Sequence, residues 1–315
     1  MITVMVTVIF RQLPHTLLAG ALGLAFAGLA GGTSAGASRA ARGPAVVRVV
    51  AAENVWGNIT SQLGGRDVRV TSLITNPNDD PHLFETSAAG AATLAQARVV
   101  VENGAGYDTW MQSLLSADGG HPGVVVASSV LHIGGSDPNP HLWYDIPRVP
   151  AVASAITSAL IRAAPLDAPT FRANLVRFDA SLAPLVATLA TIKKNFHDVS
   201  IAYTERVPGY AVAVADLDVK TPPGFARSIE EGVDPGPADT LAMQQLITRH
   251  DINVLLYNVQ TVTPVTTQIR ALAVRHGIPV VGVSETMPAG VATYQQWQQS
   301  QLTHLLHALQ SSRSP

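Results

Sequence analysis

The chain has 315 residues and a formal net charge of −2, and only 13% of its residues are charged. An average soluble protein carries about 25% charged residues, and here Lys and Arg form no cluster. Nucleic acid and anionic membrane surfaces are therefore excluded as expected partners, because both require a concentrated positive field.

The first 37 residues have the pattern of a secretory signal peptide. Arg11 precedes an apolar run over residues 17–30, and small residues ending in Ala35-Gly36-Ala37 follow it. The run is shorter than the ~20 residues of a membrane-spanning helix, although an uncleaved anchor stays an open alternative. We expect an exported protein, periplasmic or associated with the cell surface, with a linker at residues 38–44. Because the chain has no cysteine, we expect no disulfide and no lipid-modified N-terminal cysteine.

Residues 45–166 alternate between strand and helix patterns. Strands are predicted at 45–51, 68–74, 99–102 and 123–128, and helices at 53–63, 86–97 and 147–164. Gly64-Gly65 is expected to end the first helix, and Asp145 is a candidate cap for the last. Alternation of this kind predicts a mainly parallel sheet covered by helices on both faces.

Residues 167–196 carry apolar side chains at steps of three and four over thirty residues, which predicts a helix about 45 Å long. Beyond it, strands are predicted at 199–203, 210–215, 254–257 and 280–283, and helices at 238–249, 266–276 and 294–310. The expected architecture is α/β, with two lobes that each contain a mainly parallel sheet flanked by helices. One long rigid helix is expected to join the N-terminal lobe (45–166) to the C-terminal lobe (197–315).

Two loops place a histidine in the same context. His82 and His141 each follow a proline and precede a leucine and an aromatic residue. Proline fixes its own φ and restricts its neighbour, so each histidine is expected on a stiffened loop. Neutral imidazole is the commonest metal ligand, and the pair therefore suggests a metal site if the fold brings the loops together.

Two carboxylates occupy corresponding places in the second lobe. Glu205 follows the strand predicted at 199–203, and Glu285 follows the strand predicted at 280–283. Ligands in open α/β sheets bind outside the carboxyl ends of the strands. Two imidazoles and two carboxylates would balance the charge of a divalent cation. A surface ion pair between Glu205 and Arg206, and a helix N-terminal role for Glu285, stay open as alternatives.

Five segments give the chain a specific resemblance: residues 80–85 (DPHLFE), 101–104 (VENG) with Trp110, 140–143 (PHLW), 228–235 (SIEEGVDP) and 294–309. In this order they resemble the cluster A-I solute-binding proteins of bacterial ABC transporters for Zn²⁺ and Mn²⁺. The resemblance implies a non-enzymatic, monomeric protein that carries one divalent metal ion to a membrane permease and its ATPase.

The same resemblance implies ligands at His82, His141, Glu205 and Glu285. The chain departs from the family pattern at Asn139, where aspartate is common, at Glu285, where aspartate is commoner, and in lacking an acidic, His-rich loop. Zn²⁺ is the most expected transported ion and Mn²⁺ is the next. Fe²⁺ is also compatible with a site of two imidazoles and two carboxylates.

Two other functions stay open as alternatives. A secreted zinc hydrolase would need a metal-activated water and a general base, and the sequence contains neither H-E-x-x-H nor a complete serine nucleophile elbow. A metal-stabilised surface adhesin would keep the fold and make the metal structural.

Overall fold

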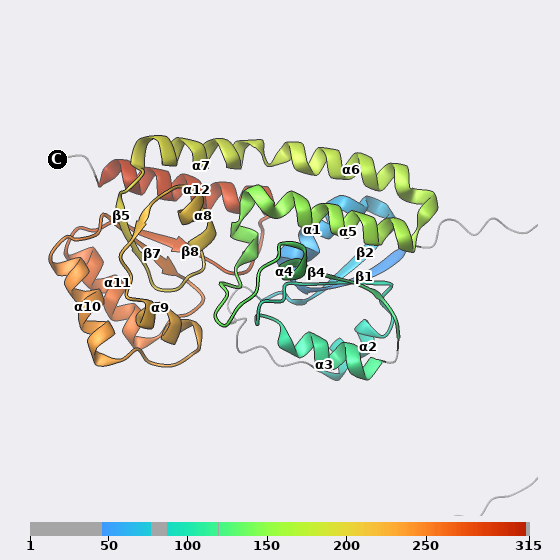
Figure 1. The fold of residues 1–315 in the computed structure, drawn as a ribbon, viewed down its shortest axis with the longest axis horizontal. Helices are drawn as coiled ribbons and strands as arrows, with labels where there is room; N and C mark the ends of the chain where they lie inside the picture. Colours follow the sequence, from blue (N-terminus) through green and yellow to red (C-terminus); the bar gives the residue numbers. More distant parts are fainter. Residues whose placement is uncertain (1–45, 77–86, 119, 313–315) are drawn as a thin grey trace, which may run out of the picture. The chain divides into compact units, whose positions relative to one another are not determined.

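A computed structural model describes residues 46–76, 87–118 and 120–312, which belong to one compact unit (Figure 1). The expected signal peptide and His82 lie outside the described residues. Within them the chain forms two α/β lobes, each built on its own four-stranded sheet.

The first lobe contains a parallel sheet with strand order β2-β1-β3-β4. Its strands are β1 (Val47–Glu53), β2 (Val68–Ile74), β3 (Val99–Glu102) and β4 (Gly123–Val126). In the register of the sheet, Val49 of β1 stands opposite Val70 of β2 and Val99 of β3. The sheet is therefore the parallel one that the alternating pattern predicts.

Helices cover both faces of this sheet (Figure 1). On one face lie α1 (Asn54–Gly64) and α5 (Val149–Ala163), and on the other lie α2 (Ala88–Leu94) and α3 (Thr109–Asp118). Successive strand side chains point to opposite faces. Val49 and Ala51 accordingly join the core with α1 and α5, whereas Val50 and Ala52 join the core with α2 and α3. Burial on both faces explains the apolar run over residues 49–52 of β1.

The second lobe repeats this arrangement with strand order β6-β5-β7-β8, again all parallel. Its strands are β5 (Ser200–Tyr203), β6 (Asp218–Val219), β7 (Val254–Asn258) and β8 (Val280–Val283). Leu255 packs with α9 (Pro223–Glu230), α10 (Pro237–Thr248) and α11 (Pro264–Arg275). Leu256 points to the other face and joins the core cluster that also contains Val49. The two lobes thus meet through continuous apolar packing.

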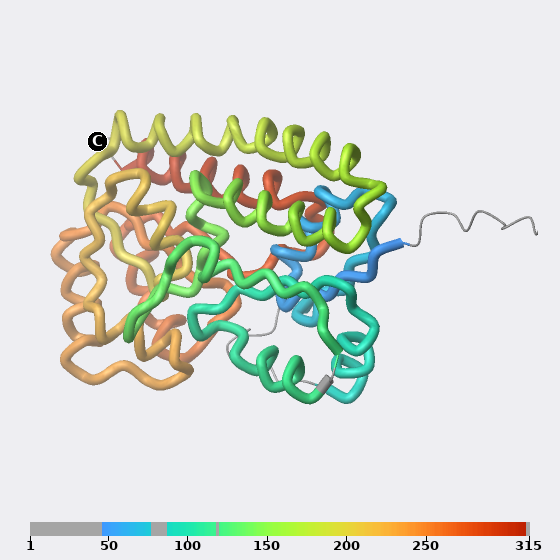
Figure 2. The backbone as a smooth tube through the Cα atoms, turned by 45° about the vertical axis from the view of Figure 1, so that its right-hand side comes forward, coloured from blue at the N-terminus to red at the C-terminus, as the bar shows by residue number. Residues whose placement is uncertain are grey.

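The connection between the lobes is a bent pair of helices rather than one rigid helix. α6 (Ala168–Ser181) and α7 (Ala183–Phe196) are interrupted at Leu182. Pro184 explains the interruption, because proline has no N–H and its ring clashes with the carbonyl four residues earlier. α12 (Tyr294–Ser311) runs beside α7 (Figure 2).

This helical stretch is long and apolar enough to cross a membrane by length and composition. Its apolar face, which includes Phe171, Leu185 and Leu189, is buried in the main core of the described unit. Core packing therefore accounts for its composition.

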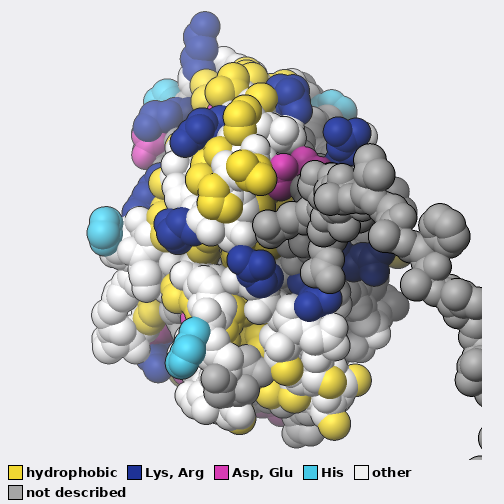
Figure 3. All heavy atoms as spheres, turned by 90° about the vertical axis from the view of Figure 1, so that its right-hand side faces the viewer, with side chains coloured by type: hydrophobic (Ala, Val, Ile, Leu, Met, Phe, Trp, Pro, Cys, Tyr) yellow, Lys and Arg dark blue, Asp and Glu magenta, His cyan; other side chains and the backbone are white. Residues whose placement is uncertain are grey.

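On the described part of the face in Figure 3, basic side chains are scattered among apolar ones rather than gathered into a stripe.

Two local predictions were wrong. Residues 210–215 do not form a strand, because Gly209–Val214 is the helix α8, whose Ala211 and Val212 are buried in the core. Asp145 does not cap α5 with its side chain, which instead pairs with Arg148 at 3.2 Å. The chain enters α5 through two 3-10 turns, η3 (Leu142–Tyr144) and η4 (Ile146–Arg148).

Candidate metal site

His141 lies at the start of η3, in a turn fixed by buried neighbours. Its side chain is fully buried, and its ring packs edge-on against Tyr107 and Trp143 with centroid separations of 5.9 and 5.8 Å. The hydroxyl of Tyr144 donates to the carbonyl of Ser284 at 2.7 Å, which ties this turn to the loop before Glu285. The turn is therefore held on both sides of the imidazole.

The tautomer of His141 follows from its hydrogen bonds. Asn139 Nδ2 donates to the carbonyl of Arg206 at 2.8 Å, so Asn139 Oδ1 is the atom that faces His141. An amide oxygen only accepts, and His141 Nδ1, at 2.8 Å from it, must therefore carry a proton. The other ring nitrogen, Nε2, lies 3.3 Å from Glu285 Oε2.

Glu205 follows β5 and is buried, with 1% of its surface exposed. The adjacent Arg206 turns away from it and pairs with Glu230 at 2.7 Å and Asp137 at 3.0 Å. The alternative interpretation of Glu205 as the partner of Arg206 in a surface ion pair is therefore wrong.

Glu285 follows β8 and is fully buried at the centre of a hydrogen-bond network. Its backbone N–H donates to Gln260 Oε1 at 2.5 Å, and its Oε2 accepts from the hydroxyl of Tyr107 at 3.0 Å. Asn258, the last residue of β7, donates from Nδ2 to Glu285 Oε1 at 2.7 Å and also to Glu205 Oε2. One amide thus links the two carboxylates.

The structure therefore brings three of the four sequence-predicted ligands into one connected, buried network. His141 and Glu285 are in direct contact, Glu205 joins them through Asn258, and His82 lies outside the described residues. Within residues 46–76, 87–118 and 120–312, no three His, Asp or Glu side chains form a group able to hold a metal. The four-ligand site stays a prediction.

Three uncharged neighbours of the carboxylates were missed by the sequence reasoning: Tyr107, Asn258 and Gln260. Position alone could have found two of them. Asn258 ends β7, just as Glu205 and Glu285 each lie two residues after the end of a strand, and Tyr107 lies in the loop after β3. In parallel sheets, functional groups commonly lie at the carboxyl ends of the strands and in the loops that follow them.

A second cluster of buried acidic side chains consists of Glu53, Glu102 and Asp108. Glu53 and Glu102 are the last residues of β1 and β3, and Asp108 lies in the loop after β3. Burial raises the pKa of Glu53 well above its ordinary value, and the nearby Asp108 carboxylate raises it further. Burial also raises the pKa of Glu102 to about 7. The pKa of Asp108 is raised by burial, although the N–H groups of Asn103 and Gly104, at 2.6 and 2.7 Å, act in the opposite direction.

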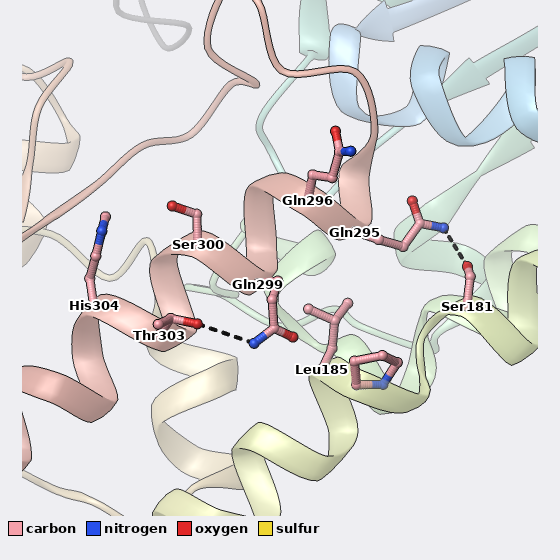
Figure 4. A pocket seen from close by; sticks show the side chains of 9 residues that line it. Ser181, Leu185, Gln295, Gln296, Gln299, Ser300, Thr303 and His304 are labelled. Atoms are coloured by element: carbon pink, nitrogen blue, oxygen red, sulfur yellow. Dashed lines mark hydrogen bonds between the residues drawn. The ribbon is translucent and has the colours of Figure 1, made fainter.

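Two of the grooves formed by the described residues lie at the junction of α6 with α7 and where the lobes meet. The first, of about 450 Å³, lies between α12 and the junction of α6 with α7, where Gln295 donates to Ser181 at 2.7 Å (Figure 4). Its described lining does not include His141, Glu205 or Glu285. The second, of about 350 Å³, lies where the lobes meet and is lined by Asp137, Pro140 and Arg206. This cleft adjoins both His141 and Glu205 along the chain.

Two parallel-sheet lobes joined through a bent helical connection also occur in solved periplasmic metal-binding proteins. The periplasmic zinc-binding protein TroA from Treponema pallidum has this fold, with a TM-score of 0.71 over 84% of this chain and 99% of TroA at 18% identity. The solute-binding protein FpvC from P. aeruginosa, solved with Ni²⁺, gives a TM-score of 0.72 over 85% and 98% at 19% identity.

The chain belongs to the family described as zinc-uptake complex component A, periplasmic, whose family model matches residues 49–308. It is 28% identical over 143 residues to the manganese-binding lipoprotein MntA of Bacillus subtilis, covering 43% of this chain and 46% of MntA. The chain thus spans about half the length of the curated relatives it matches. The family is named for a component of zinc uptake, and these relatives are described as metal-binding proteins rather than as enzymes.

Proposed function

We propose that this protein captures one divalent metal ion outside the cell and delivers it to an ABC permease and its ATPase for import. The proposed ligands are His82, His141, Glu205 and Glu285. We expect the exported protein to act as a monomer, in the periplasm or at the cell surface, without a lipid on cysteine.

The contact between His141 and Glu285 carries the proposal. With Nδ1 protonated, Nε2 presents a lone pair to a carboxylate oxygen 3.3 Å away, inside a fully buried site. Two electron-rich atoms at this distance are held favourably when a positive charge lies on or between them, either a proton or a metal cation. Imidazole Nε2 and carboxylate oxygen are both ligands that divalent transition metals prefer.

Zn²⁺ is the first candidate and Mn²⁺ the second. Intrinsic affinity at an N/O site is greater for Zn²⁺ than for Mn²⁺, whereas two carboxylates beside two imidazoles also suit the harder ion. Both ions occur among the relatives, because TroA is described as zinc-binding and MntA as manganese-binding.

Calorimetric titration with Zn²⁺ and Mn²⁺ separately tests the proposal, together with elemental analysis of protein purified without added metal. We expect one ion per chain, and loss of most of the affinity in the double variant Glu205→Ala/Glu285→Ala. Asp251→Ala, at an exposed position, is the matched control and should bind as the wild type does. Unchanged binding in the double variant would refute the site.

A further inference from the structure

Asn139 contacts both of the chain segments that carry ligands from opposite lobes. It stands two residues before His141, and its side-chain amide reaches the backbone of Arg206, the residue after Glu205. The two ends of this amide make different contacts, and each has a separate consequence for the proposed site.

The oxygen end fixes the imidazole of His141. Asn139 Oδ1 accepts from His141 Nδ1 at 2.8 Å and from the backbone N–H of His141 at 3.0 Å. These bonds hold the ring with Nε2 as the nitrogen that offers a lone pair. Partners of this kind fix the tautomer and orientation of metal-binding histidines.

The nitrogen end joins the lobes. Asn139 Nδ2 donates to the Arg206 carbonyl at 2.8 Å, and the hydroxyl of Tyr210 donates back to the Asn139 carbonyl at 2.8 Å. The side chains of Arg206 and Asp137 add an ion pair at 3.0 Å between the same two segments.

Gly209 makes this close approach possible. A Cβ atom at position 209 would lie 2.7 Å from Asn139 Nδ2, closer than side-chain carbons approach a neighbour without a shift. The contact between the two segments is therefore built into the backbone of α8 as well as into the side chain of Asn139.

We propose that Asn139 is a positioning residue that couples the two ligand loops: it sets the metal-binding nitrogen of His141 and holds that loop against the Glu205 loop of the other lobe. The coupling slows metal release, because the loops cannot separate until the bond to the Arg206 carbonyl breaks. This inference rests on the proposed function. Aspartate at position 139 would keep the acceptor for His141 but would have no N–H for that carbonyl.

The variants Asn139→Asp, Asn139→Ala and Tyr210→Phe separate the two roles, with Ser136→Ala in the same loop as control. The readouts are the Kd for Zn²⁺, the release rate of Zn²⁺ into excess chelator, and the His141 tautomer by ¹⁵N NMR of metal-free protein. Asn139→Asp and Tyr210→Phe should keep the Nδ1–H tautomer while release becomes about fivefold faster, the effect of one lost hydrogen bond. Asn139→Ala should lose the single tautomer and about 10–100-fold in affinity.

Release at the wild-type rate in both Asn139→Asp and Tyr210→Phe would overturn the coupling between the loops. A single Nδ1–H tautomer in Asn139→Ala would overturn the positioning of His141. If Asn139→Ala does not fold, Asn139→Asp still decides the coupling, because it replaces only the amide nitrogen that donates to the Arg206 carbonyl. If wild-type protein binds no Zn²⁺ or Mn²⁺, the proposed function fails by itself, and the tautomer of the metal-free protein still decides the role of Asn139 toward His141.

Discussion

Replacing Asn258 with alanine is expected to destabilise the metal-free protein far more than the metal-loaded protein. The Asn258 amide donates to both Glu205 and Glu285, which are buried carboxylates. A hydrogen bond to a charged group contributes about 1.5–3 kcal/mol, so removing two of them should cost about 3–6 kcal/mol. A bound divalent cation would neutralise the same carboxylates, and the variant should then recover a large part of this loss.

Thermal unfolding with and without saturating Zn²⁺ measures this difference. For a domain of this size, about 3 kcal/mol corresponds to a fall in Tm of roughly 6–12 °C in the metal-free protein. The control is Thr261→Val, which removes another contact of Asn258 Nδ2, at 3.0 Å, without touching a carboxylate. The control should lower both Tm values equally. An equal fall of both values in Asn258→Ala would refute the reasoning, because it would show that the cation and the amide do not stabilise the same charges.

Three further predictions concern groups around the site. Burial raises the pKa of Glu102 to about 7 in the folded protein, against an ordinary 4.5. Below about pH 4.5 the carboxyl is protonated in both the folded and the unfolded state, and it does not change the free energy of unfolding. As pH rises from about 4.5 to 7 the unfolded state releases the proton more easily, so a loss of stability of about 3 kcal/mol develops and persists at higher pH. Urea unfolding of metal-free Glu102→Gln should therefore show higher stability than wild type at pH 8.5 and equal stability at pH 4; a variant less stable at pH 8.5 would contradict this. Tyr107→Phe removes the hydroxyl that donates to Glu285 and should weaken Zn²⁺ binding about tenfold in a titration. It should lower the Tm of the metal-free protein by about half as much as Asn258→Ala does, because one hydrogen bond to a buried carboxylate is lost instead of two; full affinity would show that this bond does not position the carboxylate. Gly104→Ala should cost about 2–4 kcal/mol in urea unfolding, because φ is 74° and the new methyl group would overlap the side chains of Ser128 and Val126, whereas Gly106→Ala, with φ of 86° and open space, should cost only about 1–2 kcal/mol; equal losses would contradict the steric argument.

The sequence predicted the strands best where an apolar run has clear ends. β2, β3 and β8 begin and end where the pattern places them. β3 and β8 are short, largely apolar runs, whereas β2 alternates apolar and polar side chains from Val68 to Thr71. Residues 210–215 misled because alternating Ala and Val suit a strand as well as a short buried helix, and only tertiary packing decides between them.

The connecting helix shows a different limit of sequence reasoning. The apolar steps of three and four continue across residues 167–196, so the pattern predicts one helix. Pro184 interrupts the hydrogen bonding at Leu182 while leaving the buried face continuous, which is why the periodicity does not reveal the bend.

The candidate site was predictable from its titratable residues and not from its amides. Charge and position after a strand single out Glu205 and Glu285. Asn139 and Asn258 carry no charge, and their importance follows from which donors and acceptors the fold places beside them. Such contacts join residues far apart in the chain, so no local pattern encodes them.

Anomalous diffraction from crystals of the Zn²⁺-loaded protein, recorded at the zinc absorption edge, tests the central claim most directly. We expect one peak per chain, about 2.0–2.2 Å from His141 Nε2 and from carboxylate oxygens of Glu205 and Glu285, with His82 as the fourth ligand. A peak that is bound by other side chains, or one that persists at the same place in Glu205→Ala/Glu285→Ala, would contradict the account.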